Sequence, residues 1–71
     1  MEKFFLRPED EYIKLGQLIK ACGMVENGAM AKMEIQYGNV LLNGKIEYRR
    51  GKKVREGDIV EFDGEQILVC R

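Results

Sequence analysis

The hydrophobic pattern of this chain changes its period near Gly38, and that change constrains the fold more than any other feature. Before Gly38 the apolar residues recur at the spacing of a helix face, and after it they alternate, as in half-buried strands. Asn43-Gly44, which interrupts the alternating region, is the strongest short-range signal for a β-hairpin. The sequence therefore predicts an α+β chain in which two helices precede most of the sheet.

The first predicted helix spans about residues 12–22. Asp10 is its expected N-cap, and Gly23 is expected to end it at the C′ position. Its apolar residues all fall on one face, which can pack against a core. That face consists of Leu15, Leu18, Ile19 and Cys22.

A second helix is expected to begin at Asn27, as its cap, and to end at Gly38. The short connection between the helices favours a compact helical hairpin. We interpret the methionines of this helix as flexible side chains that fill gaps in the core. Its two apolar stripes consist of Ala31 with Ile35, and of Met30 and Met33 with Tyr37.

The remaining apolar segments predict the strands of a small sheet. Residues 4–6 precede Pro8 and suit an edge strand. Asn43-Gly44 and Asp63-Gly64 are each expected to join two strands in a hairpin. The expected fold class is thus α+β, a two-helix hairpin packed on a small antiparallel sheet of about four to five strands, in one domain over residues 1–71. The expected strand residues after the helices are Val40, Leu42, Ile46, Tyr48, Val60, Phe62, Ile67 and Val69.

The residue inventory argues against several classes of function. The chain has no histidine, serine or threonine and no Gly-rich phosphate loop, so we expect no catalytic residue and no enzyme activity. Cys22 and Cys70 have no metal-binding spacing, so we expect no metal and no other cofactor, and we interpret both as buried or half-buried thiols. No secretion signal and no membrane-spanning apolar stretch are visible, and the expected location is the cytoplasm.

A neutral total charge conceals an uneven distribution. Residues 14–55 carry nine basic and three acidic side chains, whereas the two ends carry three basic and nine acidic ones. This pattern favours a surface that binds a polyanion, because local charge acts within a Debye length. Arg49 and Arg50 are expected to hold phosphates bidentately. Residues 45–55 contain one acid, Glu47, and six cations: Lys45, Arg49, Arg50, Lys52, Lys53 and Arg55.

Several spaced motifs resemble the S4-type RNA-binding domain, also called the alpha-L motif. The motifs are Ala31-Lys32-x-x-Ile35-x-x-Gly38-x-Val40-x-Leu42-Asn43-Gly44 and, after Val54, Gly57-Asp58-x-Val60. Within the family the chain is most similar to the stand-alone bacterial YaaA/YbcJ-like subfamily, and the resemblance covers roughly residues 12–62. It implies a non-enzymatic protein that binds structured RNA, ribosomal or transfer RNA, in ribosome assembly or translation.

The resemblance also implies where RNA would bind. Lys14 and Lys32 match basic positions of the family, whereas Asn27 and Gly28 stand where the family usually has a serine–arginine pair. The charge pattern indicates the same helices and the adjoining loop. Tyr48 is interpreted either as a platform for an unpaired base or as a cross-strand packing residue. The candidate RNA-binding residues are Lys14, Lys20, Asn27, Lys32, Lys45, Tyr48, Arg49, Arg50, Lys52, Lys53 and Arg55.

Two other classes of protein share some of these features. A protein–protein adaptor would dock on a ribosomal or assembly-factor protein through Phe4, Phe5 or the acidic ends. A ubiquitin-like sulfur carrier also has an Asn-Gly turn and a late Gly-Asp, but such carriers end in Gly-Gly and this sequence ends in Val69-Cys70-Arg71. We therefore expect a monomeric binder of structured RNA, free or on a ribosomal particle, with the adaptor as the alternative.

Overall fold

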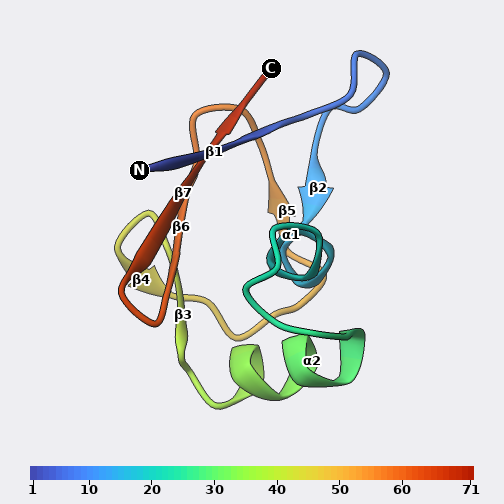
Figure 1. Ribbon diagram of the computed structural model, residues 1–71. Helices are drawn as coiled ribbons and strands as arrows, with labels where there is room; N and C mark the ends of the chain where they lie inside the picture. The colour runs from blue at the N-terminus through green and yellow to red at the C-terminus, as the bar shows by residue number, and fades with distance from the viewer.

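The computed structural model describes residues 1–71, and both helices lie on one side of a five-stranded sheet (Figure 1). A separate two-stranded ribbon lies on the same side of the sheet as the helices. Neither helix has the length and apolar character needed to cross a membrane. The elements are β1 Glu2–Phe5, β2 Ile13–Lys14, α1 Leu15–Ala21, α2 Gly28–Gln36, β3 Val40–Leu42, β4 Lys45–Ile46, β5 Lys53–Val54, β6 Ile59–Phe62 and β7 Glu65–Cys70.

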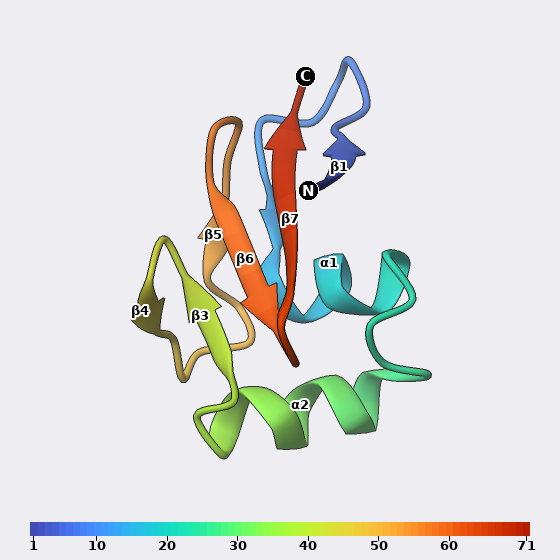
Figure 2. The ribbon, with the colours of Figure 1, turned by 60° about the vertical axis from the view of Figure 1, so that its left-hand side comes forward.

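The large sheet has the strand order β1-β7-β6-β3-β4, which Figure 2 shows from β1 at one edge to β4 at the other. Its β3–β4 and β6–β7 pairs are antiparallel, as expected from the two hairpin signals, and β3 also pairs antiparallel with β6. β1 is an edge strand, which confirms that prediction, but it runs parallel to β7. The sheet is therefore mixed and not wholly antiparallel, because the first strand of the chain joins the last one after a long connection.

The core lies between the helices and the sheet. The predicted helix faces are confirmed: the Leu15, Leu18 and Ile19 side chains of α1 have no exposed surface, and Ala31 and Ile35 of α2 are buried. Leu6, Val25 and valines of the sheet and ribbon complete one apolar cluster, and Cys22 packs at its edge as a half-buried thiol. Burial raises the pKa of the Cys22 thiol to about 11. The cluster valines are Val40, Val54, Val60 and Val69.

Helix α1 begins at Leu15, three residues later than the sequence predicts. Ile13 and Lys14 instead form β2, because they pair with β5, a strand that was expected to be part of a loop. Asp10 is not the N-cap, since its carboxylate accepts a hydrogen bond from Arg7 Nε over 2.9 Å. The first amides of α1 are satisfied by tertiary bonds: the Leu15 and Gly16 N–H groups donate to the carbonyl oxygens of Lys52 and Arg50.

The predicted cap of α2 is confirmed. The Asn27 side-chain oxygen accepts a hydrogen bond from the Met30 N–H over 2.9 Å. The methionine interpretation is wrong for two residues, because 39% of Met30 and 50% of Met33 are exposed on the outer face of α2. A nine-residue helix that already buries Ala31 and Ile35 against the core turns these two positions to solvent.

The Asn43-Gly44 turn is held from outside the hairpin. Both residues have positive φ, 52° and 83°, as a type I′ turn requires. The Asn43 side-chain amide donates to the Asp58 carboxylate over 3.0 Å, and its oxygen accepts from the Ile59 N–H over 2.9 Å. Asn43 and Asp58, two residues of the family motif, therefore connect the hairpin to β6 and have a structural role.

Candidate nucleic-acid interface

The β2–β5 ribbon presents cations on its outer face. Ile13 pairs with Val54, and Lys14 pairs with Lys53 directly across the ribbon. Val54 has no exposed surface and Ile13 packs on the core, so the alternation of side chains places Lys14 and Lys53 on the opposite face. Like charges directly opposite each other destabilise a strand pair. The Lys14–Lys53 pair therefore indicates that these positions serve a purpose other than the stability of the fold.

Tyr12 extends this face of the ribbon. The Lys53 ammonium lies 4.9 Å from the centre of the Tyr12 ring, and the Arg55 guanidinium carbon lies 5.6 Å from it. The ring quadrupole attracts both cations and fixes them over one side chain. The ribbon thus holds Lys53 and Arg55 over a single tyrosine.

A hollow of about 300 Å³ lies between the start of α1, the start of α2 and the loop before β5. Lys14, Lys20 and Arg50 line it, and no acidic residue does. The backbone bonds from α1 to the Arg50 and Lys52 carbonyls hold the loop here. Gly28 leaves the rim open, because a Cβ at this position would meet nothing within 4 Å. The hollow has room for a small anion among three cations.

The ribbon and the hollow share Lys14 and form one continuous surface, which we call the cationic strip. None of its five cations takes part in an ion pair, although acidic and basic residues are equally frequent in the chain. The cationic strip is exposed, so these charges keep their hydration at little cost and remain available to an anionic partner. It consists of Lys14, Lys20, Arg50, Lys53 and Arg55.

Arg49 stands apart from its neighbour Arg50. Its side chain binds Glu47 through Nε over 3.1 Å and Nη2 over 3.4 Å, and its N–H donates to the same carboxylate. The hydrogen bond from Arg49 lowers the pKa of the Glu47 carboxyl, and the same pair raises the pKa of Arg49. Because Glu47 already occupies Nε and Nη2 of Arg49, this guanidinium is less available to bind a phosphate than the sequence predicts.

The other candidate residues lie outside the cationic strip. Lys52 contributes to lowering the pKa of Glu47, and Lys45 belongs to the edge strand β4. Lys32 is exposed one residue after Ala31, which lines the hollow. Asn27 uses its side-chain oxygen as the helix cap. The structure thus brings together five of the eleven candidates, with Asn27 and Lys32 on the adjacent helix.

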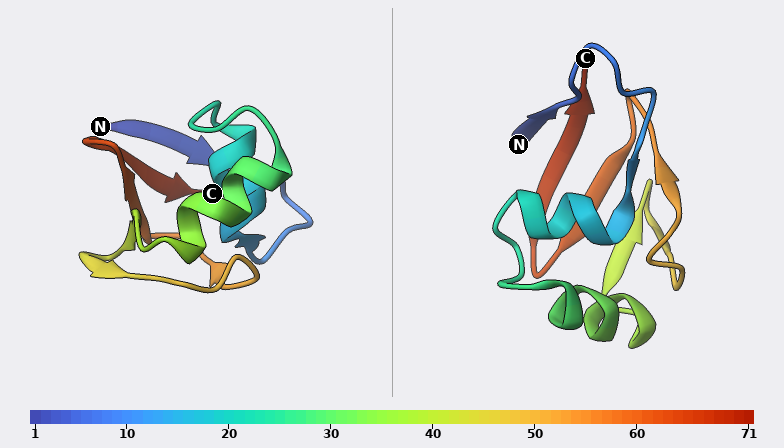
Figure 3. Two further views of the ribbon diagram at one scale, coloured as in Figure 1. Left: turned by 90° about the horizontal axis from the view of Figure 1, so that it is seen from below. Right: turned by 90° about the vertical axis from the view of Figure 1, so that its right-hand side faces the viewer.

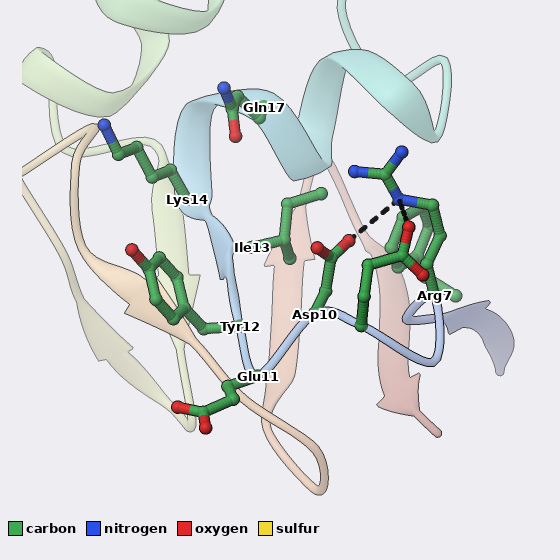
Figure 4. A pocket seen from close by; sticks show the side chains of 9 residues that line it. Arg7, Asp10, Glu11, Tyr12, Ile13, Lys14 and Gln17 are labelled. Atoms are coloured by element: carbon green, nitrogen blue, oxygen red, sulfur yellow. Dashed lines mark hydrogen bonds and ion pairs between the residues drawn. The ribbon is translucent and has the colours of Figure 1, made fainter.

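A wider depression borders the cationic strip on the side of the N-terminal loop (Figure 4). Within it Arg7 binds Asp10 over 2.9 Å and Glu9 over 3.8 Å, and these bonds raise the pKa of the Arg7 guanidinium. In Figure 4 the Lys14 side chain extends away from these carboxylates. The acidic residues of this depression therefore mark where the cationic strip ends. The chain holds no group of three or more side chains arranged to bind a metal ion.

Tyr12 is the residue of this surface that the sequence interpretation missed. It was assigned to the start of a helix, whereas it precedes β2. The available signal was the matching alternation of Tyr12-x-Lys14 and Lys53-x-Arg55 around Ile13 and Val54. Read as two short paired strands, these segments place all four outer side chains on one face.

The fold and this surface define a small domain in which two helices and a mixed sheet present a cationic face. Residues 6–70 match the S4 domain family. The chain therefore belongs to the S4 domain family, and the resemblance seen in its motifs is confirmed.

Similar proteins are known from bacteria. The chain is 39% identical over 56 residues to the "Probable ribosome maturation protein RlbA" of Bacillus subtilis (strain 168), covering 79% of each chain. It is 36% identical over 58 residues to the "Putative RNA-binding protein YbcJ" of Escherichia coli (strain K12), covering 82% of this chain and 83% of that one.

The fold prediction is confirmed by a solved structure. The solution structure of YbcJ from E. coli, described as containing an alfaL motif involved in RNA-binding, matches with a TM-score of 0.75 and 34% identity. The match covers 100% of this chain and 89% of that one. The α+β alpha-L fold expected from the sequence is thus the fold of this protein.

Proposed function

We propose that this protein is a small, non-enzymatic, monomeric RNA-binding protein that holds the sugar–phosphate backbone of structured RNA on the cationic strip. The observation that carries the proposal is the set of five unpaired cations, two of them in a destabilising cross-strand pair. Lysine and arginine neutralise phosphates and release their counterions, which favours binding without reading base sequence.

The names of the relatives support RNA as the partner, and we propose that it is ribosomal or transfer RNA. One relative is described as a ribosome maturation protein and another as an RNA-binding protein. An exposed cationic surface of this size suits the phosphates that border a groove, because the base edges of duplex RNA lie deep in a narrow groove. We therefore propose a cytoplasmic role in ribosome assembly or translation, in which RNA shape and phosphate spacing decide what is bound.

Salt titration of RNA binding tests this proposal. Five phosphate contacts predict that log K falls with log salt with a slope of about −3.5 to −4.5. The probe is a fluorescent hairpin taken from ribosomal RNA, and binding is followed by anisotropy. Replacing Lys14 and Lys53 by glutamine should lower affinity at least about 10-fold and reduce the slope by about 1.4 to 1.8.

A matched variant controls for the loss of charge. Lys3 lies on β1, and Lys45 lies on β4, and both are exposed outside the cationic strip. Replacing them by glutamine removes two positive charges from other surfaces, so this variant should retain most of the affinity. Equal losses in both variants would show that total charge, and not the cationic strip, binds the RNA.

The adaptor alternative rests on a different surface. Phe5 is 62% exposed on the edge strand β1, whose outer side has no partner strand in the sheet. An exposed apolar residue on an open sheet edge suits an extended protein segment. A Phe5→Glu variant should bind RNA normally if the proposal is correct, whereas an adaptor should lose its protein partner.

A further inference from the structure

The outer face of α2 is unusually apolar for a surface turned to solvent. Met30, Met33 and Tyr37 are 39%, 50% and 70% exposed, while the opposite face of the helix packs on the core. Tyr48 and Ile46, from the segment after the Asn43-Gly44 turn, are also exposed, at 59% and 50%. Exposed apolar groups that gather on one face of a small protein indicate an interaction surface.

Tyr48 is fixed against the end of α2. Gly38 has φ +81°, and a Cβ at this position would lie 3.2 Å from Tyr48 Cε1 and 3.6 Å from the Tyr48 hydroxyl oxygen. The absence of a side chain at Gly38 therefore allows the tyrosine ring to rest on the backbone. Part of the Tyr48 ring therefore rests on Gly38, the residue that follows Tyr37 in the chain, and more than half of Tyr48 stays exposed. The contact makes Tyr48 a preorganised aromatic surface.

This aromatic surface adjoins the cationic strip. Tyr48 and Arg50 are two residues apart, so their Cα atoms lie within about 7 Å of each other. Figure 3 shows the segment between β4 and β5 passing alongside α2. Within this segment Tyr48 lies against Gly38, and Arg50 lines the hollow together with Gly28. A nucleotide strand whose phosphate is held by Arg50 can therefore place a neighbouring base on the tyrosine.

The nearby carboxylates are engaged and oppose an anionic strand only weakly. Glu47 binds Arg49, and only 14% of its side chain is exposed, whereas 72% of the Arg49 side chain is exposed. Glu34 accepts a hydrogen bond from the Asn39 side-chain amide over 3.0 Å. Both carboxylates therefore have a hydrogen-bond partner of their own, which weakens their repulsion of a phosphate near the tyrosines.

We propose that Tyr37 and Tyr48 form a stacking platform for an unpaired nucleobase. This inference rests on the proposed function and specifies its substrate class: RNA in which an unpaired nucleotide adjoins a base-paired segment, as in a bulge or loop. Base stacking on aromatic side chains tolerates any base, so the platform adds a preference for RNA shape and not for sequence.

Two RNA hairpins test the platform. They have the same stem, and one carries a single bulged 2-aminopurine. We expect the wild-type protein to bind the bulged hairpin more tightly and to quench its fluorescence. The double variant Tyr37→Leu, Tyr48→Leu should lose about 5- to 100-fold in affinity for the bulged hairpin, and the quenching, with little change for the paired one.

Two further variants keep the test decisive. The double variant Tyr37→Phe, Tyr48→Phe retains both rings and should keep the preference for the bulged hairpin. Phe5→Leu removes an exposed aromatic ring elsewhere and should not change the affinity for either hairpin. Thermal melting confirms that each variant is folded. Equal losses on both hairpins, or no loss on either, would overturn the platform and leave the face to a protein partner. If the wild-type protein binds neither hairpin, this result contradicts both the proposed function and the platform.

Discussion

Two groups of arginines and lysines in this protein differ in their partners. Arg7, Arg49 and Arg71 each bind a carboxylate within 4 Å, and they stabilise loops or chain ends. The five cations of the cationic strip bind none, and two of them face each other across a ribbon. The first group has the contacts of a structural ion pair, whereas the second keeps an uncompensated charge. The comparison teaches that a candidate binding cation needs both the absence of a carboxylate partner and a place beside other such cations, since Lys3, Lys45 and Lys52 are also unpaired but lie outside the cationic strip.

Reversing one charge in the cationic strip should separate stability from binding. In Lys14→Glu the new carboxylate would face Lys53 across the ribbon and stand at the start of α1, where a negative charge is favourable. We expect the free energy of unfolding to rise by about 0.5–1 kcal/mol, and RNA affinity to fall at least about 10-fold.

Urea denaturation and anisotropy measure the two effects of Lys14→Glu. Arg49→Glu is the matched reversal in the paired group, and it should lower stability because it places two carboxylates together. A Lys14→Glu protein that is less stable than the wild type would contradict the claim that this cross-strand pair is maintained for binding.

Filling the rim of the hollow should strengthen binding. Gly28 lies at the first position of α2, where an added Cβ has open space. In Gly28→Arg a guanidinium would join the cations of the hollow, and we expect about a 5-fold gain in RNA affinity with a steeper salt dependence. Gly28→Gln adds a side chain without charge and should give little gain. A similar gain in both variants would assign the effect to helix propensity.

The smallest expected effect concerns the paired group. The pKa of Glu47 is lowered by Arg49, so the folded state holds this proton less tightly than the unfolded state. The pair therefore stabilises the fold at pH values above the ordinary pKa of 4.5, and this contribution is lost as the pH falls through the folded-state value. Glu47→Gln should be slightly less stable at pH 7 and lose less stability on acidification. Urea midpoints from pH 7 to pH 3 test this, and an unchanged pH profile would contradict it.

Local signals in the sequence predicted the parts of the fold that local chemistry controls. The Asn27 cap, the apolar stripe of α1 and the Asn43-Gly44 turn were predicted, because each depends on residues a few positions apart. The parallel pairing of β1 with β7 and the two-residue strands β2 and β5 were not predicted. These pairs join segments distant in the chain, and two residues are too few to show a strand period.

The sequence also predicted only some features of the candidate site. Charge density indicated residues 45–55, and the structure places Arg50, Lys53 and Arg55 of this segment on one surface with Lys14 and Lys20. Charge density could not show that Arg49 binds Glu47, because that pair forms within an irregular segment with no repeating geometry. Tyr12 was missed for the same reason as β2: its place beside Arg55 is set by tertiary pairing.

The most direct test of the cationic strip is a map of RNA contacts on the protein itself. Two-dimensional ¹H–¹⁵N NMR spectra of the labelled 71-residue chain, recorded during titration with a ribosomal RNA hairpin, report which backbone amides change. We predict the largest shift changes at residues 12–20 and 50–55 and at the start of α2, with small changes around Arg7, Arg71 and the β6–β7 hairpin. Changes concentrated on β1 or the β6–β7 hairpin, with residues 12–20 and 50–55 unaffected, would contradict the account.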